Sequence, residues 1–454
     1  MIKDMTVGNP TKLILSFAIP MLIGNIFQQF YNMVDTMIVG RFVGVDALAG
    51  VGSTGSMNFL VLGFMIGIAS GFSIIISQYF GAGDETKLRK SVAMSVYLSI
   101  AITIVVTVLS LFLTRPLLEL MQTPEDIIEH AYTYISIIFA GIVVTLCFNL
   151  LSAILRALGD SKTPLFFLII ASLVNVVLDL VFIINFKMGV AGAAYATVIS
   201  QAVSCVLCFF YMKKKCTILK MNKEDWKLDI PICKQLLNLG IPNAFQCSVT
   251  AIGVMVLQST INGFGSTIVA AYTAASKVEQ LAIQPSMTVG MAVGTYAAQN
   301  LGAKKLDRVR LGIRKTIVIS FILCISCGIL ISLLGGPLTT LFVSGEQQAV
   351  IAASKQYIYT VSIFFSVLGL LFIYRSTLQG LGNAIIPFWS GVVELIMRVG
   401  VALILSRMIG FSGVCLAGPF AWTGAAILLG ISYYRTIHRL EKEQALSQEI
   451  ILEA

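Results

Sequence analysis

Charged residues are scarce in this chain of 454 residues, since Asp, Glu, Lys and Arg together make up 12% of it and hydrophobic residues 57%. A soluble globular protein has about 25% charged residues, so the composition excludes that class and also excludes intrinsic disorder. Histidine occurs only twice, and the nine cysteines, an odd number, lie mostly inside apolar runs. This pattern argues against a zinc centre and against a disulfide framework.

Motifs for nucleotide-driven or metal-dependent chemistry are also missing. The sequence has no G-x-x-x-x-G-K-[S/T] phosphate loop, no H-E-x-x-H motif and no polar stretch long enough for a nucleotide-binding domain. We therefore expect no enzyme activity and no cofactor, and any active transport has to be driven by an ion gradient.

Long apolar runs are what the sequence does contain. About 20 apolar residues cross a bilayer as a helix, whereas barrel strands are shorter and alternate in polarity. Twelve runs reach the helical length, at 13–39, 53–79, 91–113, 131–154, 164–186, 189–212, 236–261, 267–299, 316–343, 355–378, 387–409 and 412–434. The sequence predicts an all-α polytopic membrane protein with twelve transmembrane helices in the lipid bilayer.

The chain is an internal repeat. Three short motifs recur 221 to 223 residues later: Ile19-Pro20 as Ile241-Pro242, QYFGA at 78–82 as QNLGA at 299–303, and ALGD at 157–160 as GLGN at 380–383. Six spans per repeat predict two parallel six-helix bundles related by a pseudo-two-fold axis along the membrane normal. The predicted parts are an amino-terminal lobe (1–212), a cytoplasmic linker (213–235), a carboxyl-terminal lobe (236–436) and a cytoplasmic tail (437–454).

Basic residues are distributed unequally between alternate loops. Roughly 24 Lys and Arg residues, Arg375 among them, fall on the side of both termini, against five on the other side. The residues on that other side are Arg41, Arg115, Lys187, Lys355 and Arg407. This bias predicts a multi-pass plasma (inner) membrane protein with both termini in the cytoplasm, and it explains the net charge of +9 without nucleic-acid binding.

Two acidic residues lie inside predicted spans of the amino-terminal lobe, where an ionisable group costs about 2.5–3.5 kcal/mol. Asp35 ends a polar stripe that begins with Asn25, Gln28 and Asn32, and Asp179 follows Ser172 and Asn175 at helical spacing. Neutral oxygen donors on other spans are Tyr134, Thr145, Asn149, Ser152, Thr197 and Gln201. Such oxygen ligands suit a proton or Na⁺. Hydrogen bonds between helices, at about 0.6 kcal/mol each, are the alternative, and they explain the serines better than the aspartates.

The carboxyl-terminal lobe lacks this acidic pair, because Asp35 corresponds to Leu257 and Asp179 to Ala402. Instead it has Glu394 and Arg398, four residues apart, a spacing that predicts an ion pair on one helix face. A structural pair and a role in substrate binding or gating both remain open. The sequence assigns no role to Lys277 and Glu279.

Two further features concern helix shape. Pro20 removes a backbone hydrogen bond before the polar stripe, so we expect a hinge there. Gly63, Gly67 and Gly71 form a G-x-x-x-G-x-x-x-G ridge that predicts close helix packing.

Together, the repeat, Pro20 with Asp35, the motifs QYFGAG and QNLGAK, and the Asn175/Asp179 pair resemble the multidrug and toxic compound extrusion (MATE) family over nearly the whole chain. The resemblance is to the branch with its cation site in the amino-terminal lobe. It implies a site made of Asp35, Asn175, Asp179 and Thr197, with Tyr134 and Asn149 beside it, and an antiporter that exports organic, often cationic, compounds in exchange for H⁺ or Na⁺.

We expect a monomer that transports small organic substrates by alternating access. The substrate cavity is expected to have polar contacts from Gln28, Asn32, Gln246 and Gln284. Apart from the coupling ion, no metal is expected. A flippase or exporter of an amphiphilic or lipid-linked metabolite is the alternative within the same superfold. A passive channel or a membrane receptor is disfavoured, because no sensing domain is apparent and the acids occur in one lobe only.

Overall fold

The computed structural model describes residues 2–121, 123–339 and 348–453, and all regular elements in these ranges are helical. The chain divides into two compact units. Unit 1 comprises Met1–Asp4 and Ile19–Ala244, and unit 2 comprises Met5–Ala18 and Phe245–Ala454. The prediction of an all-α protein is confirmed.

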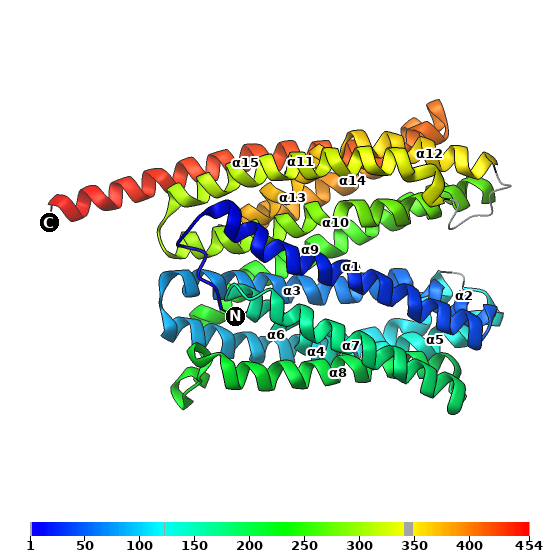
Figure 1. Ribbon diagram of the computed structural model, residues 1–454, viewed down its shortest axis with the longest axis horizontal. Helices are drawn as coiled ribbons and strands as arrows, with labels where there is room; N and C mark the ends of the chain where they lie inside the picture. Colours follow the sequence, from blue (N-terminus) through cyan, green and yellow to red (C-terminus); the bar gives the residue numbers. More distant parts are fainter. Residues whose placement is uncertain (1, 122, 340–347, 454) are drawn as a thin grey trace. The chain divides into compact units, whose positions relative to one another are not determined.

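Unit 1 is a bundle of long apolar helices (Figure 1). Its helices are α1 (Pro10–Phe42), α2 (Val45–Ser53), α3 (Gly55–Ala82), α4 (Glu85–Leu120), α5 (Glu125–Ala140), α6 (Ile142–Ala157), α7 (Lys162–Leu180) and α8 (Gly189–Lys215). A π-helix, η1 (Val181–Asn185), follows α7 directly, and two 3₁₀ turns, η2 (Thr217–Leu219) and η3 (Lys223–Trp226), follow α8. Helices α5 and α6 form one span that is bent by 50°.

Unit 2 repeats this order of elements. Its helices are α9 (Ile230–Asn262), α10 (Ser266–Gly302), α11 (Leu306–Thr339), α12 (Gln348–Ile363), α13 (Phe365–Gly380), α14 (Ile385–Ile409) and α15 (Phe411–Glu453). Its fourth span, α12 with α13, is bent by 51° and corresponds to the bent span of unit 1. The region predicted as a tail continues α15 without a break.

The predicted number of spans agrees with these helices. Within residues 2–121, 123–339 and 348–453, eight helices are long and apolar enough to cross a membrane, and the number is ten if each bent pair is one span. The long helices α10 and α14, which contain Glu279 and Glu394, correspond to the remaining two of the twelve predicted spans. Residues 340–343 of the ninth predicted run lie outside the described residues. The two bends and the π-helix were not predicted, because hydropathy reports composition and not the direction of a helix axis.

Unit membership changes inside two helices, close to a proline in each. Residues 5–18 belong to unit 2 although α1 continues into unit 1, and the first part of α9 belongs to unit 1. The changes occur at Ala18/Ile19 and Ala244/Phe245, each within three residues of Pro20 or Pro242.

The QNLGAK motif holds the amino-terminal segment in unit 2. The Gln299 side chain accepts a hydrogen bond from the Met5 backbone N–H (2.9 Å), and Asn300 Nδ2 donates to the Met5 carbonyl (3.2 Å). Arg308 on α11 adds a bond from Nη2 to the carbonyl of Gly8 (2.9 Å). The motif is therefore structural in this chain, since its amides satisfy backbone groups that precede a helix.

The glycine ridge of α3 permits close backbone packing within unit 1. A Cβ atom on Gly71 would lie 2.5 Å from Gly240 Cα, and one on Gly67 would lie 2.6 Å from Ala244 Cα. Asn243 Nδ2 also donates to the carbonyl of Gly67 (3.1 Å). The prediction of close packing is confirmed at these two glycines, which bring α3 and the first part of α9 together.

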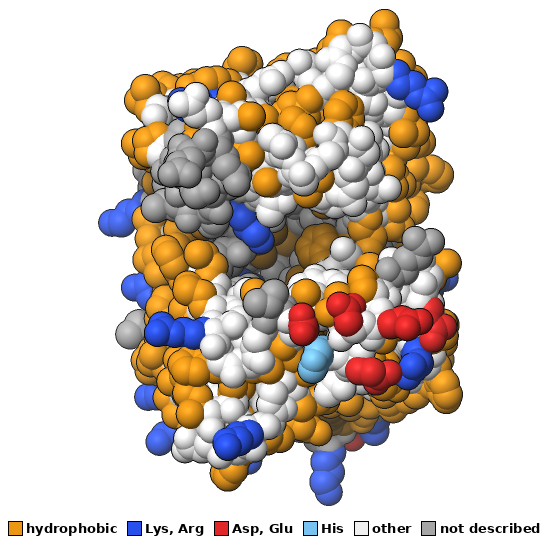
Figure 2. Space-filling view, turned by 90° about the vertical axis from the view of Figure 1, so that its right-hand side faces the viewer, with side chains coloured by type: hydrophobic (Ala, Val, Ile, Leu, Met, Phe, Trp, Pro, Cys, Tyr) orange, Lys and Arg blue, Asp and Glu red, His pale blue; other side chains and the backbone are white. Residues whose placement is uncertain are grey.

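Acidic side chains gather on one end face of the molecule, beside a histidine (Figure 2). In unit 1 the end of α4 and the start of α5 contribute Glu119, Glu125, Asp126 and Glu129. Arg115 forms ion pairs with Glu119 (3.4 Å) and Glu129 (3.1 Å) on this exposed surface. The acidic segment of the sequence thus lies at one membrane end of unit 1.

Candidate cation site in unit 1

Two carboxyl groups from different helices meet in the interior of unit 1. Asp35 on α1 and Asp179 near the end of α7 lie close to each other and interact electrostatically. Asp179 is fully buried, and Asp35 is partly buried. Among the ion pairs of the described side chains, none includes either aspartate, so the two acids face each other without a basic partner.

A network of neutral polar groups surrounds this pair. The Tyr31 side chain on α1 lies close to that of Thr197 on α8, and Asn175 Nδ2 donates to Thr197 Oγ1 (3.4 Å). Asn175 is completely buried, and Tyr134 on α5 is 8% exposed and close to both acids. Four helices therefore contribute to one polar cluster, which we call the Asp35–Asp179 cluster: Tyr31, Asp35, Tyr134, Asn175, Asp179 and Thr197.

Four buried oxygen atoms in this cluster have no hydrogen-bond donor among the described residues. They are Asp35 Oδ1, Asn175 Oδ1 and both carboxylate oxygens of Asp179. Burying a polar group without a partner costs about 1–3 kcal/mol, and more for a charged group. All four are hard oxygen acceptors, the ligand type that a proton or Na⁺ requires.

The backbone around Asp179 is irregular. One residue after Leu180, the helix changes from α to π over Val181–Asn185. Single π turns inside helices occur frequently at functional sites, because the widened turn shifts the register of the side chains around it. The register change thus falls directly beside the buried carboxyl group.

Asn149, which was also predicted for this site, forms its hydrogen bond outside the Asp35–Asp179 cluster. Asn149 on α6 donates to the carbonyl of Thr145 (2.8 Å), and the Thr145 hydroxyl is hydrogen-bonded to Gln201. Asn149 is therefore linked through Thr145 to Gln201 and not to the aspartates. Pro20 lies inside α1, with its side chain buried.

The four predicted substrate contacts divide between the units. Gln28 and Asn32 are exposed side chains of α1 in unit 1. In unit 2, Gln246 is 7% exposed and hydrogen-bonded to Thr250 (3.1 Å), and the Gln284 carbonyl accepts a bond from Thr288 (2.7 Å). Their role in substrate binding stays a prediction.

Unit 2 has a buried charge cluster of different composition. Glu394 accepts hydrogen bonds from Arg398 Nη2 (2.7 Å) and from Arg375 Nη2 on α13 (2.8 Å). All three residues are at most 8% exposed. In the count of basic residues on each side of the membrane, Arg375 was assigned to the cytoplasmic loops. In the structure it is a buried residue of α13, so this assignment was wrong. The spacing of residues along α14 predicts the pairing of Glu394 with Arg398. It does not predict the pairing with Arg375, because Arg375 is on another helix.

Glu279, to which the sequence assigned no role, extends this cluster. Its Oε2 accepts a hydrogen bond from the Tyr357 hydroxyl (2.8 Å), and it interacts electrostatically with Arg398. Tyr272 packs edge-on against Tyr357 with the ring centroids 5.1 Å apart. Lys277 is exposed two residues earlier. Glu394 and Glu279 thus interact with arginines, whereas Asp35 and Asp179 have no ion pair among the described residues.

A model of one known protein family matches this chain twice, once in each half of the internal repeat. Residues 20–181 and 242–404 each match the sequence model of the family described as MatE. The chain belongs to the multidrug and toxic compound extrusion (MATE) family. As a MATE protein it is a multi-pass membrane transporter for small molecules and not an enzyme. The resemblance found in the sequence is confirmed, while the branch within the MATE family stays a prediction.

Relatives of this MATE protein are similar over nearly their whole length. It is 32% identical over 445 residues to "Probable multidrug resistance protein YpnP" of Bacillus subtilis (strain 168), covering 95% of this chain and 96% of that one. Two solved MATE structures share the fold at 25% identity and a TM-score of 0.89. One is described as the straight conformation (97% of this chain and 98% of that chain) and one as the bent conformation (96% and 98%). These structures support two bundles of six helices in this MATE protein.

Proposed function

We propose that this MATE protein is an antiporter that exports organic, cationic compounds by alternating access and is driven by H⁺ or Na⁺. The observation that carries the proposal is the Asp35–Asp179 cluster, in which two carboxyl groups meet without a basic partner among the described residues. The name of the relative YpnP, a probable multidrug resistance protein, supports drug-like substrates.

The exchange follows from the electrostatics of this cluster. Two ionised carboxylates in a poorly solvated site repel each other, and a proton or Na⁺ between them removes the repulsion. The oxygens of Asp35, Asp179 and Asn175 supply ligands for Na⁺, and a single proton shared by the carboxyl groups satisfies the same need. A membrane potential contributes about 2.3 kcal/mol per charge for each 100 mV, which is enough to drive accumulation.

Helix α1 connects cation binding to the substrate. Gln28, Asn32 and Asp35 follow one another at spacings of four and three residues, so they lie along one face of α1. The exposed amides of Gln28 and Asn32 are available for a substrate, and Asp35 holds the cation. We propose that cation binding changes the bend of α1 at Pro20, which moves the two amides and releases the substrate.

The proposal includes a location and an orientation. We expect the protein in the plasma membrane as a monomer, with both termini in the cytoplasm, because basic residues are concentrated on that side of the sequence. The coupling cation then enters the Asp35–Asp179 cluster from outside, down its own gradient.

The proposal is tested with Asp179→Asn in cells that lack other dye exporters. Amide replacement keeps the shape of the side chain and removes its charge, so we expect gradient-driven efflux of a cationic dye to fall to the level of cells without the transporter. Asp126→Asn is the matched control, because Asp126 is an exposed acid at the start of α5. Normal efflux by Asp179→Asn at equal protein levels would contradict the proposal.

Proteoliposomes with separately imposed gradients identify the coupling ion. Efflux that responds to a proton gradient without Na⁺ assigns H⁺, and efflux that requires a Na⁺ gradient at equal pH assigns Na⁺. Transport of a lipid-linked substrate that is independent of both gradients would instead favour the flippase alternative.

A further inference from the structure

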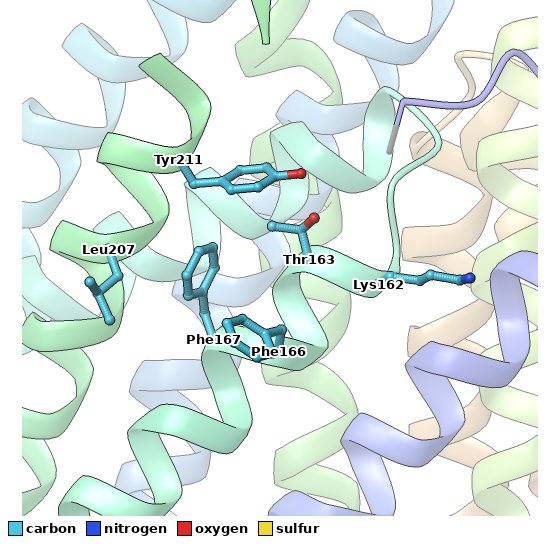
Figure 3. A pocket seen from close by; sticks show the side chains of 6 residues that line it. All are labelled: Lys162, Thr163, Phe166, Phe167, Leu207 and Tyr211. Carbon is cyan, nitrogen blue, oxygen red and sulfur yellow. The ribbon is translucent and has the colours of Figure 1, made fainter. Parts of the chain in front are cut away.

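A pocket outside the Asp35–Asp179 cluster lies at the opposite end of α7, where α7 begins and α8 ends (Figure 3). It has a volume of about 470 Å³. Six side chains line it: Lys162, Thr163, Phe166 and Phe167 from the first turns of α7, and Leu207 and Tyr211 from the last turns of α8.

The wall of this pocket is aromatic and apolar. The Phe167 ring lies edge-on to those of Phe166 and Tyr211, with centroid distances of 5.8 Å in both pairs. Phe166 is 61% exposed, and the neighbouring Phe210 on α8 is 60% exposed. Exposed apolar surface on this scale is unfavourable in water and is normal on a membrane helix that faces acyl chains.

Lysines are concentrated at the end of α7 and α8 where the pocket lies. Lys162 is exposed and extends away from the aromatic rings (Figure 3). The last turn of α8 adds three consecutive exposed lysines, Lys213, Lys214 and Lys215. Because α7 begins and α8 ends at this pocket, Lys162 and these three lysines lie at the same end of the two helices.

Asp160, an acid that precedes α7 beside the pocket, is already engaged. Asp160 is 2% exposed and accepts hydrogen bonds from the backbone N–H groups of Lys162 and Thr163, both at 3.1 Å, and from the Thr163 hydroxyl at 2.8 Å. The amino terminus of α7 is therefore capped from within the chain. The N–H groups of Lys162 and Thr163 are therefore not available to an external anion.

We propose that this pocket binds an anionic phospholipid, with an acyl chain against Phe166, Phe167 and Leu207 and the headgroup phosphate among Lys162 and the three lysines of α8. An apolar wall that ends in a cluster of ammonium groups is complementary to such a molecule and to its depth in the bilayer. The inference requires a membrane-spanning protein, but it does not depend on cation coupling or on the direction of transport.

Native mass spectrometry of the whole protein in detergent tests the site. The protein is titrated with phosphatidylglycerol and, separately, with phosphatidylcholine of the same acyl chains. We expect tighter retention of the anionic lipid, and we expect the triple variant Lys213→Gln, Lys214→Gln, Lys215→Gln to weaken that retention by about tenfold or more while retention of phosphatidylcholine changes little.

The matched control removes the same number of charges elsewhere on the surface. Lys220, Lys223 and Lys227 are exposed lysines of the connection that follows α8, and their replacement by Gln is expected to leave lipid retention unchanged. Equal retention of both lipids by the unaltered protein, or equal weakening by the two triple variants, would overturn the proposal and leave only general attraction between lysines and anions.

A second variant addresses the apolar part of the site. Leu207→Trp fills the pocket without changing the charge, so we expect loss of phosphatidylglycerol retention at an unchanged unfolding temperature. Glycerol phosphate, which has no acyl chains, is expected not to compete with the lipid. Competition by glycerol phosphate, or full retention by Leu207→Trp, would contradict a lipid site and indicate a simple phosphate contact.

Discussion

At the scale of single residues, Glu394 has the most constrained environment in unit 2. Its two carboxylate oxygens accept hydrogen bonds from two different arginines, Arg375 and Arg398, and its side chain is 5% exposed. The Nε of Arg375 and the Nη1 of Arg398 have no hydrogen-bond partner among the described residues. Glu394 is thus the carboxylate that compensates two buried guanidinium groups directly.

Removal of that carboxylate is expected to destabilise the protein strongly. Breaking a buried ion pair at one partner costs about 3–5 kcal/mol, because a charge is left buried without compensation. We expect Glu394→Gln to lower the unfolding temperature in detergent clearly, whereas Arg407→Gln, an exposed change on the same helix, leaves it nearly unchanged. Similar unfolding temperatures for the two variants would show that the cluster contributes little to stability.

The residues of the clusters were predictable from the sequence to different degrees. Asp35 and Asp179 were found because an acid inside an apolar run is costly and therefore conspicuous. Tyr31 and Arg375 were missed. A tyrosine is ordinary in a membrane helix, and an arginine near the end of a span is indistinguishable from one in a loop. Their roles depend on contacts between helices, which spacing along one helix does not reveal.

At the scale of helices, the contact between α3 and α9 in unit 1 depends on the small size of Gly71. The Gly240 Cα atom would lie 2.5 Å from a Cβ at this position, and real Cβ atoms do not approach another backbone so closely. The two helices have to separate to accept any larger residue.

We therefore expect Gly71→Val to lower both the unfolding temperature and the amount of folded protein in the membrane. The reason is overpacking, which typically costs about 1–3 kcal/mol in a close-packed interior. Gly52→Val on α2 is the control, because no atom lies within 4 Å of a Cβ there. Size-exclusion profiles in detergent and thermal unfolding measure the effect, and an unaffected Gly71→Val protein would show that α3 and α9 can separate at low cost.

The helices also show which parts of the fold were predictable. The twelve spans were predicted because each requires a long apolar run, and length and composition are properties of the sequence itself. The bends of 50° and 51° were not predicted. One occurs at Gly141, where α5 ends and α6 begins and where a Cβ would meet the Val198 side chain on α8, a contact between helices that hydropathy along the chain does not reveal.

At the scale of the whole molecule, the two units differ in electrostatics although they share one order of helices. In unit 1 the acids Asp35 and Asp179 have no basic partner among the described residues, while in unit 2 Glu394 and Glu279 interact with arginines. A duplicated fold thus contains one unit with two buried carboxyl groups that have no basic partner among the described residues and one unit with a buried carboxylate between two arginines. The proposed coupling site lies in the former.

The direction of exchange depends on which membrane side the loops face, and the charge bias predicts that both termini are cytoplasmic. We expect a green fluorescent protein fused after residue 454 to fluoresce, and alkaline phosphatase fused at the same place to be inactive, because the former folds in the cytoplasm and the latter outside it. Fusions after Asp126 at the acidic end of unit 1 are expected to give the opposite pair of signals. The same signals at both positions would contradict the orientation, and cation entry into the Asp35–Asp179 cluster from outside would then have no structural basis.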